Sequence, residues 1–148
     1  FKAETIVNKE IFDKKKKTAH QAKWKTSVFD IYKKASINSK WNKILKNECE
    51  KFNIHFLTSP YDLDYIDVVN KFIPAYKIGS GDITWEEALT KISKKKKPVI
   101  LATGASTMKD VLNASKKILK INKKLILMQC NTNYTAKENN FKFINLKI

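Results

Sequence analysis

One pattern occurs four times in this sequence: a short apolar segment is followed directly by small polar residues. The four copies are residues 54–57 before Thr58-Ser59-Pro60, residues 75–78 before Gly79-Ser80-Gly81-Asp82, residues 98–102 before Thr103-Gly104-Ala105-Ser106, and residues 125–130 before Asn131-Thr132-Asn133-Tyr134. Short continuous apolar runs are typical of strands that are buried on both faces. The pattern therefore predicts four strands of a parallel sheet, each with polar residues at its carboxyl end.

Helical patterns separate the apolar segments. They comprise a face of Trp41, Ile44, Leu45, Cys49 and Phe52 after Asn38-Ser39; a face of Leu63, Ile66 and Val69 after a capping Asp62; a face of Ala88, Leu89 and Ile92 after a Thr84/Glu87 capping box; and Val111, Leu112, Ile118 and Leu119 after Thr107 and Asp110. The lysines at 94–97 suit a helix carboxyl end, and Pro98 stops that helix. Strand, polar loop and helix thus alternate along the chain.

This alternation predicts an α/β fold, and both a doubly wound sheet and a (β/α)8 TIM barrel fit it. The barrel is favoured because every predicted strand ends in polar residues, which would gather at one rim. Each unit of a barrel takes about 30 residues, so 148 residues hold about five of the eight units. If the fold is a barrel, we expect residues 1–148 to form an incomplete one. Residues 1–36 are expected to be a charged loop, helical at 27–34, and residues 37–148 to hold the strand–helix repeats.

The chain is strongly basic, with 30 basic against 14 acidic residues and a net charge of +16. Such a balance is compatible with a lysine-rich nucleic-acid-binding module. However, all the basic residues are lysine, and the arginines that usually make bidentate contacts to phosphate and guanine are missing. The other interpretation is that the lysines form a solvated surface. A salt titration distinguishes a nucleic-acid-binding module from a solvated surface, because binding to nucleic acid weakens steeply as salt rises.

Cysteine and histidine usage suggests neither a disulfide nor a metal motif. We expect Cys49, on a helix, and Cys130, in a strand, to be small buried apolar residues in a reducing compartment. His20 and His55 form no ligand motif. No run of 18 apolar residues or signal peptide is present, so a cytoplasmic protein is expected.

Lys77 lies inside the second apolar segment, where an unpaired ammonium is costly. Its partner is either Asp82 or an anionic ligand. Hydroxyls at the strand ends, with glycine amides nearby, would complete a receptor for phosphate and carboxylate groups. These hydroxyls belong to Ser59, Ser80, Thr103 and Thr132. Two alternatives stay open. The hydroxyls could serve as helix caps or turn residues without binding a ligand. Lys77 could instead form a Schiff base with a carbonyl substrate, as in aldolases.

Four motifs, in this order and spacing, resemble the N-acetylneuraminate (sialic acid) synthase family, which includes legionaminic and pseudaminic acid synthases. They are FLTSPYDLDYIDVV, PAYKIGSGDITW, KPVILATGAST and LMQCNTNYTAKENNFKFINL. The resemblance implies a TIM barrel that condenses phosphoenolpyruvate with an N-acetylated mannosamine-type sugar and releases phosphate. It implies that residues 1–148 are an incomplete catalytic barrel domain, about strands 3–6. It also implies a divalent metal, typically manganese, a homodimer, and no nucleic-acid or membrane partner.

The resemblance assigns roles residue by residue. Ser59 and Lys77 would hold the phosphoenolpyruvate carboxylate, with Lys77 the catalytic residue; Ser80 and Thr132 would contact phosphate, and Tyr134 the sugar. Ala102 departs from the family pattern, which often has serine there, so an inactive relative is a further alternative. The metal ligands and the small antifreeze-like domain are expected outside residues 1–148, and the 148-residue chain alone is expected to be inactive.

Overall fold

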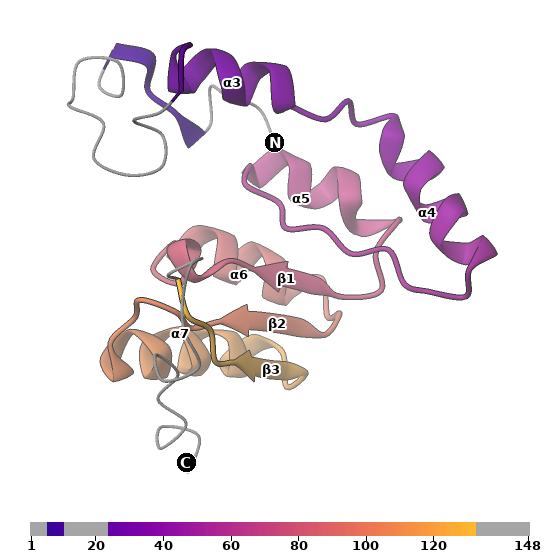
Figure 1. The fold of residues 1–148 in the computed structure, drawn as a ribbon. Helices are drawn as coiled ribbons and strands as arrows, with labels where there is room; N and C mark the ends of the chain where they lie inside the picture. Colours follow the sequence, from indigo (N-terminus) through magenta and orange to yellow (C-terminus); the bar gives the residue numbers. More distant parts are fainter. Residues whose placement is uncertain (1–5, 11–23, 133–148) are drawn as a thin grey trace. The chain divides into compact units, whose positions relative to one another are not determined.

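The computed structural model describes residues 6–10 and 24–132 (Figure 1). The chain divides into two compact units. The N-terminal unit comprises Phe1–Ile54 and Pro60–Phe72, and the sheet unit comprises His55–Ser59 and Ile73–Ile148. In the described part of the chain, no helix is long and apolar enough to cross a membrane.

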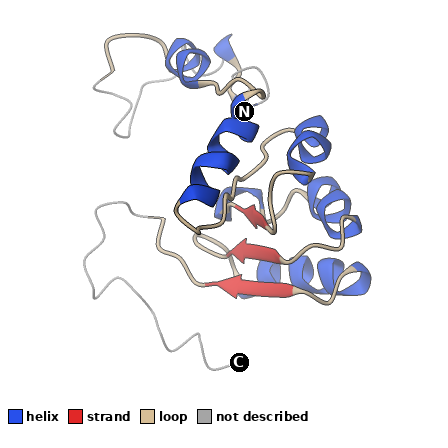
Figure 2. Cartoon of the chain, turned by 90° about the vertical axis from the view of Figure 1, so that its right-hand side faces the viewer, coloured by secondary structure: helices blue, strands red, loops and turns tan. Residues whose placement is uncertain are grey.

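The sheet unit is built on three parallel strands, β1 (Tyr76–Ile78), β2 (Val99–Ala102) and β3 (Leu125–Met128), in the order β1-β2-β3. They lie side by side and point the same way (Figure 2). The register aligns Lys77 with Ile100 and Ile100 with Ile126. Side chains alternate between the faces of a strand, so these three residues share one face of the sheet.

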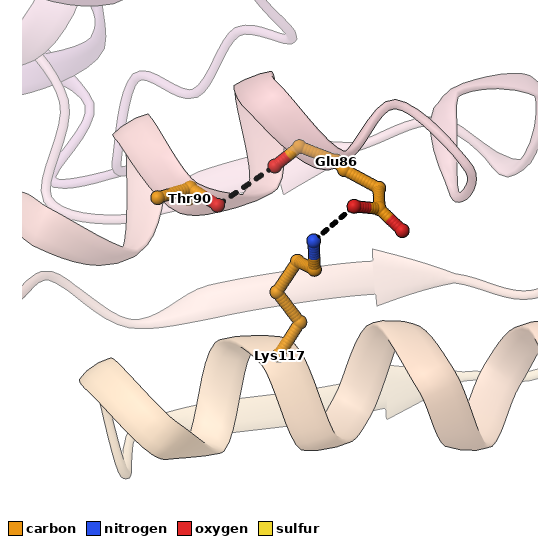
Figure 3. A network of polar contacts seen from close by, with 3 residues as sticks. All are labelled: Glu86, Thr90 and Lys117. Atoms are coloured by element: carbon orange, nitrogen blue, oxygen red, sulfur yellow. Dashed lines mark hydrogen bonds and ion pairs between the residues drawn. The ribbon is translucent and has the colours of Figure 1, made fainter.

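The other face of β1 and β2 is covered by α6 (Glu86–Lys94) and α7 (Met108–Ile121), which connect the strands and pack against each other. The core of the sheet unit consists mainly of Ile73, Tyr76, Ile78, Ile83, Ala88, Leu89, Ile92, Val99, Leu101, Ala114 and Ile118. A short interhelical ion pair joins Glu86 to Lys117, and the Thr90 hydroxyl donates to the Glu86 carbonyl oxygen at 2.8 Å (Figure 3). Consecutive parallel neighbours with both connecting helices on one face are the winding that a TIM barrel repeats.

The predicted start of α7 is confirmed and that of α6 is wrong. The Thr107 hydroxyl and the Asp110 carboxylate form a reciprocal capping box, as the sequence indicates. In α6 the N-cap is Trp85, and Thr84 makes no side-chain cap. The Trp85 N–H donates to the Asp82 carbonyl oxygen at 2.9 Å and the Glu86 N–H to the Thr84 carbonyl oxygen at 3.0 Å, so backbone turns begin this helix one residue later.

The N-terminal unit contains α3 (Val28–Ala35), α4 (Trp41–Lys51) and α5 (Leu63–Asn70). The predicted helix at 27–34 is confirmed, with Ser27 as its cap, and Asp62 caps α5 as expected. In α5 the predicted face is buried at Ile66 and Val69. An amide–phenol pair joins α4 to α5, because the Asn42 Nδ2 donates to the Tyr65 hydroxyl at 2.8 Å.

The apolar face predicted for α4 is present in the sequence but is not buried among the described residues. Trp41 and Ile44 are exposed, whereas Asn42 is buried by its contact with Tyr65. The expectation that Cys49 and Cys130 are buried is also wrong. Both are free and half-buried, and Cys130 lies two residues beyond the end of β3.

The first of the four predicted strands, at 54–57, is absent: these residues form a loop. An apolar run becomes a strand only when a neighbour supplies the ladder of hydrogen bonds. In the described sheet, β1 pairs with β2 alone, so the other edge of β1 is unpaired and residues 54–57 form no ladder with it. The described sheet thus has three of the four expected strands.

Candidate functional site

The loops that follow the three strands are joined by hydrogen bonds at the carboxyl edge of the sheet. β1 leads into the 3-10 helix η2 (Ser80–Asp82), and β2 leads into residues 103–107 before α7. The Thr103 N–H and hydroxyl donate to the Met128 carbonyl oxygen at 3.0 and 3.2 Å. The Gly104 N–H donates to the Ser80 Oγ at 3.0 Å, so the second loop is bound to both of its neighbours.

Gly104 lies where the three loops meet. A methyl group built on its α-carbon would lie 2.8 Å from the Thr132 Cγ2, 3.0 Å from the Ser80 Oγ and 3.1 Å from the Cys130 carbonyl oxygen. Ser80 and Thr132, which are 52 residues apart in the chain, are therefore both in contact range of Gly104. We refer to Ser80, Gly104 and Thr132 as the rim cluster.

The sequence predicts Ser80 and Thr132 as anion-binding residues, but it does not predict Gly104 as part of the site. A signal was available, since Gly104 lies between a buried strand and a capped helix. That position suggests close backbone approach. What the sequence does not reveal is which residues make the approach, because they come from the loops after two other strands.

Lys77 lies in the middle of β1 on the face of the sheet opposite the helices, in a row with Ile100 and Ile126. It is half-buried, and no hydrogen bond or ion pair within 4 Å joins its ammonium to another described residue. The Lys77 ammonium interacts electrostatically with the Asp82 carboxyl. Burial raises the pKa of the Asp82 carboxyl above its ordinary value, and the Lys77 charge opposes that rise. Asp82 is thus an electrostatic neighbour of Lys77 without forming a close ion pair.

The remaining predicted residues have different places. Ser59 is half-buried in the loop at 54–60, and its hydroxyl has no hydrogen bond to another described residue. The Thr103 hydroxyl donates to the Met128 carbonyl oxygen at the end of β3, so it joins two strand ends rather than capping its own turn. Ala102 is buried at the end of β2, and Tyr134 lies outside the described residues.

The described residues offer no cluster of metal ligands. Within residues 6–10 and 24–132, no three His, Cys, Asp or Glu side chains lie close enough together to hold a metal ion. These residues do not fit the divalent metal that the resemblance implies. His55 is exposed, and His20 lies outside the described residues.

A separate cleft of about 190 Å³ lies between α6 and α7. It is lined by Ile83, Thr84, Glu86, Leu89, Asp110, Asn113, Ala114 and Lys117. None of the predicted site residues that the structure describes lines this cleft. Its position between two packed helices separates it from the row that contains Lys77.

The rim cluster carries hydrogen-bond donors of the kind that anion sites use. The Ser80 Oγ accepts from Gly104 and has no described acceptor for its own proton, and Thr132 is exposed. A hydroxyl provides one donor, and an ammonium provides three. Ser80 follows three residues after Lys77, so both donor types come from the same strand end. Such donors suit phosphate and carboxylate oxygens.

The fold places the chain among the TIM barrels. A solved N-acetylneuraminic acid synthetase from Leptospira borgpetersenii, in complex with citrate, is similar with a TM-score of 0.73 and 25% identity, covering 78% of this chain and 41% of that chain. A phospho-2-dehydro-3-deoxyheptonate aldolase from Thermotoga maritima shares the fold, with a TM-score of 0.63, at 22% identity over 73% of this chain and 33% of that chain.

The chain belongs to the NeuB family, whose model matches residues 1–148. An N,N'-diacetyllegionaminic acid synthase from Campylobacter jejuni is 32% identical over 154 aligned residues, which cover 99% of this chain and 44% of that protein. A pseudaminic acid synthase from Helicobacter pylori is 25% identical over 76% of this chain and 34% of that protein. The chain therefore spans less than half the length of the curated relatives it matches.

Proposed function

We propose that these 148 residues are part of a nonulosonic acid synthase. The full-length protein condenses phosphoenolpyruvate with an N-acetylmannosamine-type sugar in its open-chain form and releases phosphate. The observation that carries the proposal is the rim cluster at the carboxyl edge of a parallel sheet in a NeuB-family chain, with Ser80 in the turn that follows the strand of Lys77. The names of the relatives, legionaminic and pseudaminic acid synthases, support the substrate class.

In this proposal Lys77 is the catalytic residue because its ammonium holds the phosphoenolpyruvate carboxylate, and Ser59 donates to the same group. Ser80 and Thr132 donate to the phosphate oxygens, and Tyr134 contacts the sugar. The enol carbon C3 attacks the aldehyde carbon of the sugar, water adds at C2, and the C–O bond to phosphate then breaks. Such a reaction depends on positioning and charge stabilisation rather than on a covalent nucleophile.

Other parts of the proposal concern the complete protein. We propose that the complete protein uses a divalent metal, with Mn²⁺ as the first choice, and that residues outside the described ones would hold it. We also propose a homodimer in the cytoplasm, with no nucleic-acid or membrane partner. The 148-residue chain without the remaining units of the barrel is expected to give no turnover.

A phosphate-release assay on the full-length protein tests this function. We expect phosphate only when phosphoenolpyruvate, an N-acetylmannosamine-type sugar and Mn²⁺ are all present, together with one nonulosonic acid per phosphate. Release of phosphate without any sugar would contradict the proposed reaction. No turnover with any such sugar, in a folded protein loaded with Mn²⁺, would support the inactive-relative alternative.

A further inference from the structure

The hydroxyl of Ser80 has an orientation set by the neighbouring loop. A serine hydroxyl donates one hydrogen bond and accepts up to two. The Gly104 N–H donates to the Ser80 Oγ at 3.0 Å and occupies one acceptor site. The proton of Ser80 has no acceptor among the described residues, so it is free to turn toward a ligand.

Space, rather than backbone conformation, requires glycine at position 104. No described glycine has a positive φ, and the left-handed residue of this loop is Ala105, with a φ of 52°. A Cβ at position 104 would instead lie 2.8 Å from the Thr132 Cγ2 and 3.0 Å from the Ser80 Oγ. Gly104 is itself buried, and the backbone fixes the direction of a Cβ, so the new methyl group could not turn away from either neighbour.

We propose that Gly104 is a positioning residue for the anion site. Its N–H holds the Ser80 oxygen as an acceptor, so that the Ser80 proton points to the ligand. Its missing side chain lets Thr132 approach, so that hydroxyls from two strand ends converge on one anion. Gly104 itself need not touch the ligand, and it acts through Ser80 and Thr132. This inference rests on the proposed function, because it takes the anion to be the phosphate of phosphoenolpyruvate.

The test uses titration of phosphoenolpyruvate, and of inorganic phosphate as a second probe, into the full-length protein. Gly104→Ala is expected to weaken binding of both by on the order of 10- to 100-fold, since one or two charge-assisted hydrogen bonds are displaced. The KM for phosphoenolpyruvate should rise by a similar factor while the KM for the sugar stays unchanged. Gly81→Ala is the matched control, because a methyl group there meets nothing within 4 Å.

Two further variants separate positioning from folding. Thr132→Ser removes the methyl group that lies 2.8 Å from the new Cβ and keeps the hydroxyl. The double variant Gly104→Ala/Thr132→Ser should therefore bind phosphoenolpyruvate at least threefold more tightly than Gly104→Ala alone. Ser80→Ala should weaken phosphoenolpyruvate binding by itself, and Gly104→Ala should then add less than its effect in the wild type. Coupling of this kind is expected of residues that act through one another.

Each outcome decides the question. Unchanged phosphoenolpyruvate affinity in Gly104→Ala would overturn the positioning role. So would a Gly104→Ala/Ser80→Ala double variant whose fold-loss in affinity equals the product of the two single-variant losses. A Gly104→Ala protein that melts far below the wild type even with Thr132→Ser would assign Gly104 to folding alone and would also overturn it. A folded wild type that does not bind phosphoenolpyruvate would refute the proposed function itself, and the inference with it.

Discussion

Asp82 and Asp110 both lie near the start of a helix in the sheet unit, but their surroundings shift the carboxyl pKa in opposite directions. Burial raises the pKa of Asp82, and the Lys77 ammonium only partly opposes this rise. The Thr107 hydroxyl and N–H donate hydrogen bonds to Asp110 and lower its pKa. Ionised Asp82 therefore destabilises the folded state, whereas ionised Asp110 stabilises it.

We predict opposite pH dependences for Asp82→Asn and Asp110→Asn in the full-length protein. Asp82→Asn should be more stable than the wild type at neutral pH, and the difference should disappear as the pH falls to about 3.8, the ordinary value for this group. Asp110→Asn should be less stable than the wild type at neutral pH. That difference should disappear only as the pH falls below 3.8, through the lowered pKa of the folded state.

Urea unfolding at several pH values measures both differences. The sign is the decisive quantity, because the two substitutions are chemically identical. An Asp82→Asn variant that is destabilised at neutral pH would show that the attraction to Lys77 outweighs the cost of burying the carboxylate.

Helix starts show how far local sequence determines an element. The Thr-x-x-acid spacing occurs before both α6 and α7, but only Thr107 and Asp110 close a capping box. At α6 the N–H groups of Trp85 and Glu86 bond to backbone carbonyl oxygens of the preceding turn. Trp85 is therefore the N-cap, and Thr84 lies one residue before it. Local spacing thus indicates where a capping box could form, and the preceding loop decides whether it does.

We predict that Thr107→Ala lowers the free energy of unfolding by about 1 kcal/mol, because it removes the cap of α7. The matched variant Thr84→Ala should change it by less than about 0.5 kcal/mol, since its hydroxyl caps nothing. Chemical unfolding of the two full-length variants checks this. Equal losses would mean that Thr84 caps α6 in solution after all.

The same distinction applies to the strands and to the site. Residues 75–78, 98–102 and 125–130 contain observed strands because neighbouring copies of the pattern pair with one another. Residues 54–57 have the same apolar character and no described partner, so composition alone is insufficient there. The candidate hydroxyls at 80 and 132 were recognisable one by one. Their approach around Gly104 was not, because it depends on contacts between loops that are distant in the chain.

At the scale of the whole molecule, β3 exposes apolar side chains that would favour association with another chain. β3 pairs only with β2 in the described sheet, and it exposes Ile126 and Leu127 to 53% and 44%. Unpaired strand edges and large apolar patches favour association. The chain spans only 44% of its Campylobacter jejuni relative, so surfaces of this kind are expected where further barrel units would pack.

We therefore predict that the 148-residue chain, expressed alone, associates at micromolar concentrations. Replacing Ile126 by lysine should increase the monomer fraction, because charge on an edge strand opposes pairing. Replacing the exposed Lys116 of α7 by alanine is the control and should leave the fraction unchanged. Sedimentation velocity measures the distribution. A monomer that melts cooperatively would contradict the prediction.

The proposed function depends most directly on Lys77, and titration of phosphoenolpyruvate into the full-length protein tests the role of this lysine. Lys77→Met keeps the length of the side chain and removes the charge. We predict that this variant loses affinity by on the order of 100-fold, whereas Lys116→Met, at an exposed position on α7, binds as the wild type does. Wild-type affinity in Lys77→Met would contradict the assignment of this lysine to the phosphoenolpyruvate carboxylate.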